Sequence, residues 1–467
     1  MQRRALTDKP WLIGIGLCVI ALALRAKIAT DAFWLDEIWS YYLSKLMQSP
    51  WDAFSELRID NNHLLNTLLM YWTGEQANWS IYRLPALLSG VATVALMGPS
   101  SRLVAAKPWL AMLLGAISLP LIQYSAEARG YSTAALFGLV SWYICYAHLQ
   151  ARLSPAWLLA FWTSCILGML SHLTFIFVLA ALGMALLWDL AADRRDWFME
   201  LRRAAIIFVV PLIFTAWIYF YFYGRMSAGG ETPDWRLLPN LLELSRVTLG
   251  APDGPAIGIA AAILLTGLLG FGLYTLQAVQ RRFFTLAILL VPGLMLTVYQ
   301  PDYFYPRYLL VLLPFVYMIL ARALSQGLDA GRIAATISGI AISVIVFSSA
   351  VQYSELARLG KGDYPKAVAD LYGAAGDAPF TIGSDFDFRN KALLDFYVRY
   401  RKDAKQMTYI EKSYESAEPT DFFIMHNLQA AHKAKRVIAL KSGRYRLLQE
   451  YPHAGLSGWN WYLYRHE

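Results

Sequence analysis

Cysteine and charge are both scarce in this chain. Only three cysteines occur among 467 residues, and each lies inside an apolar stretch: Cys18, Cys145 and Cys165. There is no CxxC pair and no cysteine–histidine spacing, so we expect neither a disulfide framework nor a zinc site of cysteines. Charged residues make up only 16% of the chain, whereas a soluble protein has about 25%. The composition therefore argues against a soluble enzyme and indicates a membrane protein.

Several recognition signals are also missing. The segments expected to face the cytoplasm hold no glycine-rich phosphate-binding loop, which argues against a nucleotide donor. We find no internal repeat and no low-complexity tract. The net charge of +8 is accounted for by loops on the cytoplasmic side, so it does not predict a nucleic-acid partner.

The charge that is present is unevenly distributed. Of the last 116 residues 31 are charged, against 43 of the first 351. This shift predicts a membrane domain over residues 1–351 and a small α/β domain over 352–467. In the second domain we expect helices near 364–374 and 393–400, and strands near 380–383, 422–425, 436–440 and 459–464.

The first domain contains many apolar runs of membrane length, because about 20 apolar residues cross the hydrocarbon. We predict a mainly α, polytopic protein with about 11 transmembrane helices, near residues 11–30, 83–100, 109–124, 133–149, 156–171, 173–188, 204–223, 256–276, 284–299, 308–324 and 333–351. The first run is long enough to span, and more spans follow it, so it is interpreted as a retained anchor rather than a signal peptide.

The distribution of lysine and arginine predicts the orientation. With a cytoplasmic N-terminus, nearly all basic residues of the short loops face the cytoplasm, as the positive-inside rule requires. We expect a multi-pass protein of the cell (inner) membrane, with the C-terminal domain periplasmic or extracellular. The first outer loop, 31–82, is long, and its apolar spacing predicts interfacial helices at 39–47 and 63–72.

Four groups of polar residues then fall on the predicted outer face. They are the acid pair Asp36-Glu37 after the first span, His63 with Asp60 and Asn62, the short loop Glu127-Ala128-Arg129-Gly130-Tyr131, and Tyr303-Phe304-Tyr305-Pro306-Arg307-Tyr308. Charge near hydrocarbon is costly and usually marks a site. Simpler explanations also stand: Asp36-Glu37 is an ordinary acid pair in a loop after a helix end, Glu127 and Arg129 pair with one another, and Arg307 reaches to lipid headgroups. His172, expected on the same face, is then a satisfied interfacial histidine.

Two further features stay open from the residues alone. Arg25 and Lys27 lie at the outer end of the first span, where they either anchor to lipid phosphate or hold the carboxylates or a donor phosphate. Asp385-Phe386-Asp387 matches the short DxD pattern of nucleotide-sugar transferases, but it falls in the outer domain. We therefore assign it to a loop or a helix cap.

Acids and arginines on one membrane face predict transfer from a phosphate-linked donor. A carboxylate removes the acceptor proton, and arginine binds phosphate and stabilises the charge as it leaves. Because nucleotide sugars are cytosolic, the donor expected here is a sugar on a polyprenyl phosphate. A divalent cation (Mg, Mn or Zn) bound by Asp36, Glu127 and His172 is one option, and arginine doing the same electrostatic work is the other.

In several short motifs of the predicted membrane domain, the chain resembles the membrane-embedded GT-C glycosyltransferases of the family 39 type. The matching motifs are Phe33-Trp34-Leu35-Asp36-Glu37, Asn61-Asn62-His63, Tyr82-Arg83-Leu84-Pro85-Ala86-Leu87, Glu127-Ala128-Arg129-Gly130-Tyr131-Ser132 and Pro306-Arg307-Tyr308-Leu309. The resemblance covers roughly residues 10–350. Leu64-Leu65 departs from the family, which often has proline there.

The resemblance implies an inverting transfer from a polyprenyl-phosphate sugar to an extracytoplasmic glycan, lipid or protein. It implies Asp36 as the acceptor-activating acid, with Glu37 beside it and Glu127 as the second-loop acid. We expect the donor phosphate at Arg307, Tyr308, Arg129 and Arg83, and acceptor-side or structural support from His63, Asn62, Asp60, His172 and Tyr131. The alternatives are a transporter or flippase for a lipid-linked saccharide, and an oligosaccharide ligase.

Overall fold

The computed structural model describes residues 10–76, 78–149, 153–192, 197–227, 237–295, 306–399, 401–429 and 432–467. Contacts divide the chain into two compact units. The first unit comprises Met1–Ala29 and Leu43–Gln352, and the second comprises Thr30–Tyr42 and Tyr353–Glu467. The sequence predicted a division after residue 351. Thr30–Tyr42, predicted to lie in the first domain, groups instead with the second unit.

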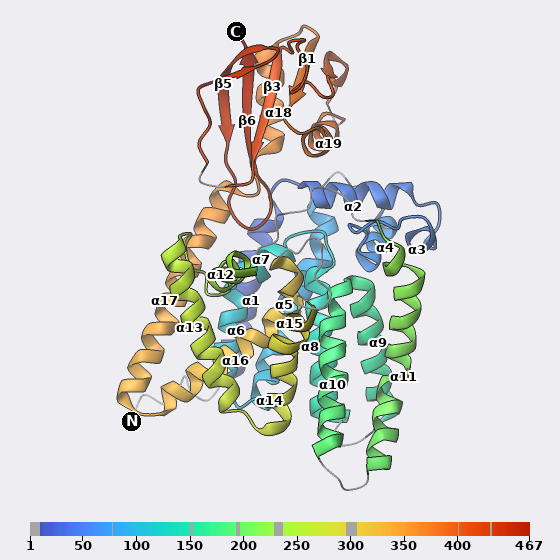
Figure 1. Ribbon diagram of the computed structural model, residues 1–467, viewed down its shortest axis with the longest axis vertical. Helices are drawn as coiled ribbons and strands as arrows, with labels where there is room; N and C mark the ends of the chain where they lie inside the picture. Colours follow the sequence, from blue (N-terminus) through green and yellow to red (C-terminus); the bar gives the residue numbers. More distant parts are fainter. Residues whose placement is uncertain are drawn as a thin grey trace. The chain divides into compact units, whose positions relative to one another are not determined.

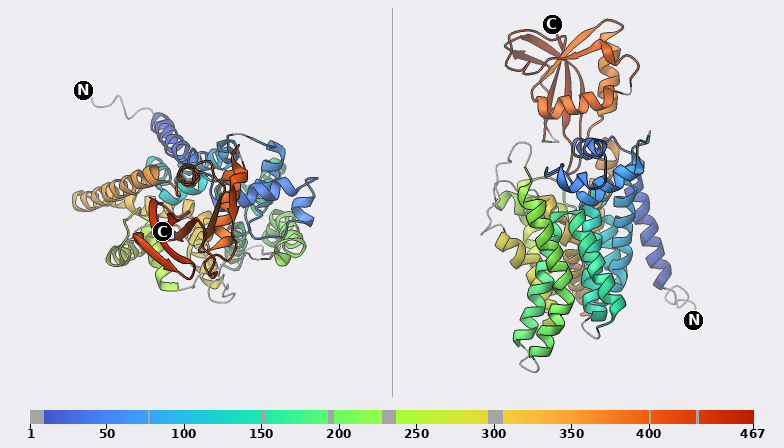
Figure 2. Two further views of the ribbon diagram at one scale, coloured as in Figure 1. Left: turned by 90° about the horizontal axis from the view of Figure 1, so that it is seen from above. Right: turned by 90° about the vertical axis from the view of Figure 1, so that its right-hand side faces the viewer.

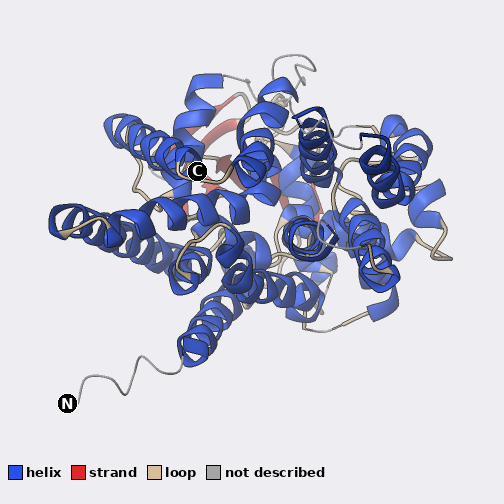
Figure 3. Cartoon of the chain, turned by 90° about the horizontal axis from the view of Figure 1, so that it is seen from below, coloured by secondary structure: helices blue, strands red, loops and turns tan. Residues whose placement is uncertain are grey.

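The first unit is built from helices (Figure 1), several of which are seen nearly end-on in Figure 3. Within it, α8 packs on α5 and α9, α5 packs on α1 and α6, and α13 packs on α16. The helices of this unit and the two that continue into the second are α1 (Pro10–Ala29), α2 (Leu35–Leu46), α3 (Asp52–Ser55), α4 (Leu64–Thr73), α5 (Ser80–Leu103), α6 (Pro108–Ile117), α7 (Leu119–Ser125), α8 (Tyr131–Ile144), α9 (Pro155–Ser171), α10 (Ile176–Ala192), α11 (Trp197–Tyr221), α12 (Leu237–Thr248), α13 (Pro255–Tyr274), α14 (Ala278–Thr285), α15 (Val291–Leu294), α16 (Leu313–Asp329) and α17 (Arg332–Leu359).

Six helical stretches in the described part of the chain are long and apolar enough to cross a membrane. They are Trp11–Ala29, Ser80–Leu103, Trp197–Arg225, Pro255–Tyr274, Pro306–Asp329 and Arg332–Ala375. The pair α6 and α7 adds a seventh if it is one span bent by 62°, and Pro155–Ser171 and Leu173–Asp189 are shorter apolar helices. The protein is therefore a polytopic membrane protein, and the predicted number of about eleven spans stays a prediction.

Small residues allow α5, α6 and α7 to pack closely. A Cβ on Gly115 of α6 would lie 2.6 Å from the sulfur of Met97, and one on Gly90 of α5 would lie 2.4 Å from Cβ of Ser125. Glycine at these positions brings the backbones together, as is usual between helices in membranes. This packing places the end of α7, and the loop that follows it, against α5.

The bend between α6 and α7 depends on a buried arginine. Arg25 of α1 is fully buried and donates to the carbonyl oxygens of Gly115 at 3.0 Å and Ala116 at 3.1 Å. These carbonyls end α6 and have no partner one turn ahead, because the chain turns at Ser118. The structure thus corrects the expectation for Arg25: its guanidinium binds backbone oxygens inside the helix bundle and does not reach lipid.

The second unit contains one six-stranded sheet with α18 (Tyr364–Ala375) and α19 (Asp387–Val398) (Figure 2). The strand order is β2-β1-β3-β6-β5-β4, with β1 parallel to β2 and β3 and the other neighbours antiparallel. The strands are β1 (Phe380–Ser384), β2 (Met407–Tyr409), β3 (Phe422–Asn427), β4 (Val437–Leu440), β5 (Gly443–Tyr451) and β6 (Asn460–His466).

The two faces of this sheet are both covered with aromatic side chains. Tyr364 of α18 packs on Trp461 with ring centroids 4.9 Å apart, and Tyr372 packs on Phe380 at 5.1 Å. A second cluster, on β3, β5 and β6, consists of Phe423, Tyr445, Tyr462 and Tyr464. Burial of large rings on both faces is the main stabilising contribution to this unit. The predicted small α/β domain is therefore present.

Candidate active site

The predicted site residues are divided between the two units. Asp36 and Glu37 belong to the second unit, on the segment Thr30–Tyr42. The remaining candidates belong to the first unit. Tyr303, Phe304 and Tyr305 of the fourth predicted group lie outside the described residues, so that this group begins at Pro306.

The loop between α7 and α8 is the centre of the site in the first unit. Ser118 begins α7 and its side chain accepts from the backbone N–H of Leu121 at 3.3 Å, which is a helix N-cap. After seven helical residues, the chain makes a tight loop in which Arg129 N donates to Glu127 O at 2.8 Å. Glu127 is fully buried and Arg129 is 3% exposed. A carboxylate and a guanidinium are thus held two residues apart, away from bulk water.

His63 connects this loop to the first outer segment. Its Nδ1 accepts from the backbone N–H of Gly130 at 2.8 Å, and its Nε2 lies 3.3 Å from Arg129 Nη2. The same Nη2 donates to Asn61 Oδ1 at 3.0 Å. Because Nδ1 accepts a backbone N–H, the neutral ring carries its proton on Nε2. The approach of Arg129 Nη2 to this nitrogen is then a contact between two donors and not a hydrogen bond. His63 therefore holds the loop through its backbone and lies against the Arg129 guanidinium.

Gly130 is required in this loop by space. A Cβ there would lie 1.9 Å from the carbonyl oxygen of Ser171 and 3.2 Å from Cβ of His63. Its φ of −79° is ordinary for any residue, so the constraint comes from close approach and not from backbone strain. Because residue 130 is a glycine, three segments come into contact here: the loop itself, the chain at His63 and the chain at Ser171.

A group of rings surrounds this meeting point. The centroids of Tyr131 and His172 are 4.3 Å apart, those of His63 and His172 are 4.6 Å apart, and those of His63 and Tyr131 are 5.1 Å apart. Tyr308 reaches His172 at 6.2 Å, and the Arg129 guanidinium lies 5.1 Å from the Tyr131 ring. Residues from three of the four predicted groups, together with His172, therefore lie close to one another, whereas the fourth group, Asp36-Glu37, belongs to the second unit.

The surroundings of the two histidines favour the neutral imidazole. Burial lowers the pKa of His63 well below its usual value, and the positive charges of Arg129 and Arg307 lower it further. Burial, with the same two arginines, lowers the pKa of His172 to about 3. Because both guanidinium groups act on the same two imidazoles, Arg129 and Arg307 share one region of the first unit. Such a region favours an anion.

Three other predicted site residues have structural contacts. Asn62 is buried, and its side-chain amide donates to the carbonyls of Ala53 at 2.9 Å and Leu57 at 2.7 Å. Arg83 is buried and donates to Ala29 O, the last residue of α1, at 2.8 Å. The backbone N–H of Asp60 donates to Ser227 O. These contacts fix the first outer segment, and the role of Arg83 in binding the donor phosphate stays a prediction.

The acid pair Asp36-Glu37 occupies the start of α2 in the second unit. Glu37 is fully buried; its Oε2 accepts from the backbone N–H of Trp34 at 3.2 Å and lies 3.6 Å from Nζ of Lys361, which is also fully buried. Asp36 is half-buried. Glu37 therefore acts as a helix cap and ion-pair partner, and Asp36 is the more accessible of the two acids.

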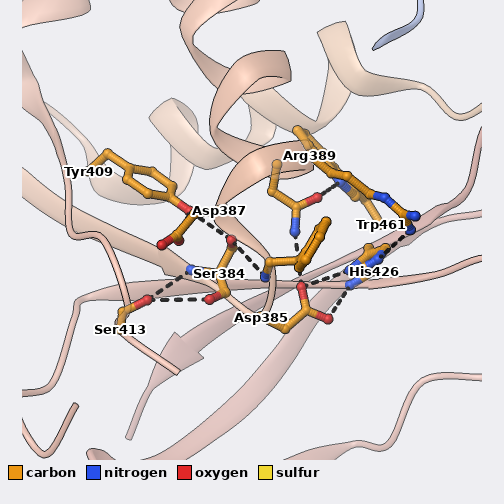
Figure 4. A network of polar contacts seen from close by, with 10 residues as sticks. Ser384, Asp385, Asp387, Arg389, Tyr409, Ser413, His426 and Trp461 are labelled. Carbon is orange, nitrogen blue, oxygen red and sulfur yellow. Dashed lines mark hydrogen bonds and ion pairs between the residues drawn. The ribbon is translucent and has the colours of Figure 1, made fainter. Parts of the chain in front are cut away.

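The DxD sequence lies where β1 meets α19, as a loop and helix start (Figure 4). Asp387 accepts from Tyr409 Oη at 2.6 Å and from the backbone N–H of Lys412 at 2.8 Å. Asp385 accepts from the backbone N–H of His426 at 3.0 Å, and its Oδ1 lies 2.9 Å from His426 Nδ1. These bonds join the ends of β1, β2 and β3, so the DxD has the structural role that the sequence predicted.

Among the residues that the structure describes, no group of three or more histidine, cysteine, aspartate and glutamate side chains is placed to hold a metal ion. His172 Nδ1 is occupied by the backbone N–H and hydroxyl of Thr174, at 3.1 and 2.9 Å. The described residues fit an anion bound by arginine better than a divalent cation.

Sequence reasoning missed two residues on which this geometry depends. Lys361 has only a weak sequence signal of a buried cation: it is a lone lysine just after an apolar helix, followed by Gly362. Ser171, whose carbonyl oxygen faces Gly130, has no sequence signal, because only its backbone is used.

Comparisons with known proteins agree with the fold. No protein-family model matches the chain, and no curated protein matches it. Its structure is similar to that of ArnT from Cupriavidus metallidurans in the apo state, with a TM-score of 0.55 and 13% identity over 90% of this chain and 93% of that one. ArnT of the same organism bound to undecaprenyl phosphate gives a TM-score of 0.51, with the same identity and coverage. ArnT has the GT-C fold, so the predicted GT-C architecture is confirmed.

Proposed function

We propose that the chain is an inverting glycosyltransferase that moves a hexose or pentose from a polyprenyl-phosphate donor to an extracytoplasmic acceptor. The observation that carries this proposal is the placement of two arginines near His63 and His172 in the first unit. Arg129 Nη2 lies 3.3 Å from His63 Nε2, and Tyr308, next to Arg307, has its ring centroid 6.2 Å from that of His172. Fixed cations in a buried site suit a phosphate that gains charge as it leaves. In keeping with this, one of the ArnT structures is bound to undecaprenyl phosphate.

In the proposed reaction, an acceptor hydroxyl oxygen forms a bond to the anomeric carbon of the sugar. The bond from that carbon to the phosphate oxygen breaks, and the polyprenyl phosphate leaves with the electron pair. Asp36 takes the hydroxyl proton as general base. Arg307 and Arg129, with Tyr308, hold the phosphate, and attack from the opposite side inverts the configuration.

We assign the two other acids different roles. Glu127, buried in the loop that carries Arg129, is the second acid of the site, and we propose that it orients the acceptor or the guanidinium groups. Glu37 is assigned to the position of Asp36 and not to proton transfer, since its carboxylate bonds Trp34 N and faces Lys361. No step of this scheme requires a metal ion.

The proposed site faces the outside of the cell (inner) membrane, with the N-terminus in the cytoplasm and the second unit periplasmic or extracellular. Support comes from the basic residues of the opposite loops, as the positive-inside rule predicts. The acceptor class that fits is a glycan, a lipid or a protein hydroxyl at that surface.

A transporter of lipid-linked saccharides is the second candidate, and the 62° bend between α6 and α7 is the observation that favours it. Transporters use the free carbonyls of broken helices to bind ions. Here Arg25 already donates to the carbonyls of Gly115 and Ala116, which leaves little for an ion. A transporter needs two compartments, whereas a transferase acts in detergent, so turnover in detergent separates the two.

The direct test is mass analysis of cell-envelope glycans and lipids from cells with and without the protein. Asp36→Asn is expected to lose transfer by about 100- to 10,000-fold, the usual contribution of a general base, without loss of expression. Glu56→Gln is the matched control, because Glu56 is an exposed acid in the same outer segment. An Asp36→Asn protein that still modifies the envelope contradicts the assignment.

A further inference from the structure

The segment Thr30–Tyr42, which carries Asp36, is bound to the second unit along its whole length. Asp31 accepts from the backbone N–H of Lys361 at 2.9 Å, and Phe33 O accepts from Tyr397 Oη at 2.5 Å. The rings of Phe33 and Phe396 stack at 5.9 Å. These contacts come before Asp36 in the chain.

Contacts of the same kind follow Asp36. Trp39 stacks on Phe388 with centroids 5.7 Å apart, and the Arg399 guanidinium lies 4.7 Å from the Tyr42 ring. Residues on both sides of Asp36 are therefore held by α19, and the first turn of α2 has little freedom to rotate.

One of these contacts is the buried ion pair of Glu37 and Lys361. Both side chains have an exposed fraction of 0%, and their charged atoms are 3.6 Å apart. Burying two charges is costly unless each neutralises the other, so removal of one partner leaves a lone buried charge and disrupts its surroundings. Asp36 is covalently next to Glu37, on a helix whose start is capped by the same Glu37 carboxylate.

The backbone next to Lys361 approaches the segment Thr30–Tyr42 closely, at Gly360. Gly360 has a φ of +59°, and a Cβ there would lie 2.3 Å from Oδ2 of Asp31. Only glycine is compatible with this approach. Tyr364 Oη, in turn, donates to Lys361 O at 2.7 Å, which fixes the turn between α17 and α18.

A polar network holds the ring on which the segment rests. Trp34 packs edge-on against Trp459 at 5.4 Å. Trp459 lies under the Arg389 guanidinium at 5.5 Å, and Arg389 Nη1 is 3.2 Å from Nε2 of His426. Asp385 then fixes His426 from the other side, as Figure 4 shows.

We infer that Lys361 is a positioning residue: through its ion pair with Glu37 it fixes the Asp36 carboxylate, which the same unit carries. This inference rests on the proposed function for the role of Asp36. Without Lys361, the first turn of α2 loses one of its contacts, and a displacement of the Asp36 carboxylate by about 1 Å lowers the rate by about 100-fold.

The test uses the full-length protein in detergent, with transfer from a polyprenyl-phosphate sugar and hydrogen exchange of the peptide 30–42 as two separate readouts. Lys361→Met is expected to lower kcat by about 100-fold, to leave the donor KM unchanged, and to speed exchange in this peptide alone. Lys361→Arg keeps the charge and restores most of kcat. Lys391→Met is the control, because the Lys391–Glu411 pair is exposed and lies in the same unit.

If Lys361→Met does not fold, the double variant Glu37→Gln/Lys361→Met replaces it, since no lone charge is then buried. Native kcat together with native exchange in residues 30–42 overturns the inference. Loss of kcat with a raised donor KM and unchanged exchange also overturns it, because Lys361 would then act on the donor. If exchange rises but Asp36→Asn is fully active, the proposed function fails while the docking of the segment stands.

Discussion

Replacing Gly130 by alanine tests the geometry of the site most directly. The added Cβ would lie 1.9 Å from the Ser171 carbonyl oxygen, so the loop must shift by more than an ångström. Such overpacking costs about 1–3 kcal/mol. The shift also weakens the bond from Gly130 N to His63 Nδ1, 2.8 Å long, and a buried group left without its partner costs about 1–3 kcal/mol more. Together these give a loss of about 2–6 kcal/mol.

The measurement is the midpoint of thermal unfolding of the detergent-solubilised protein, with transfer activity as a second readout. Gly267→Ala is the matched control: Gly267 lies in α13 and has nothing within 4 Å of the added atom, so stability should stay the same or rise. We expect Gly130→Ala to unfold at lower temperature and to lose activity, because Arg129 moves with the loop. A Gly130→Ala protein as stable and as active as the native one refutes the placement of this loop.

Two further predictions concern buried polar groups. Arg25→Met leaves the carbonyls of Gly115 and Ala116 unpaired and should destabilise the protein by about 2–5 kcal/mol, whereas Lys27→Met, at an exposed position of the same helix, should not; equal thermal midpoints contradict this. The pKa of His172 is lowered to about 3, so below pH 6.5 the unfolded state binds a proton that the folded state does not. Stability is therefore full above about pH 6.5 and falls by about 2 kcal/mol by pH 5; a pH series in which His172→Gln falls equally steeply refutes the assignment.

Local sequence patterns predicted most of the second unit. The predicted strands at 380–383, 422–425, 436–440 and 459–464 correspond to β1, β3, β4 and β6. The sequence missed β5, Gly443–Tyr451, where only Tyr445 and Tyr451 are buried and charged residues occupy the open face. It also missed β2, which is three residues long. In β5 the alternation of Arg444-Tyr445-Arg446-Leu447 stops where the register with β6 shifts, and β2 is too short to show a period, so neither carries a sustained strand pattern.

Part of the site could be predicted from the order and direction of the spans alone. Residues at the same ends of neighbouring spans come together, which is how His63, Arg129, Tyr131 and His172 were grouped. The sequence gives no sign of contacts made through backbone atoms, or of contacts between residues hundreds of positions apart. The ion pair of Glu37 with Lys361 is an example, and without it the sequence does not distinguish the role of Glu37 from that of Asp36.

Helix geometry explains why two adjacent acids differ in role here. Consecutive residues of an α-helix point about 100° apart, so Asp36 and Glu37 cannot face the same partner. Glu37, at the third position of α2, has the length to reach back to Trp34 N and to meet Lys361. Asp36, one residue earlier and one methylene shorter, is left half-buried on another face. A pair of acids at a helix start can thus divide into one that fixes the backbone and one that is presented to substrate, and the chemistry is expected to depend on the second.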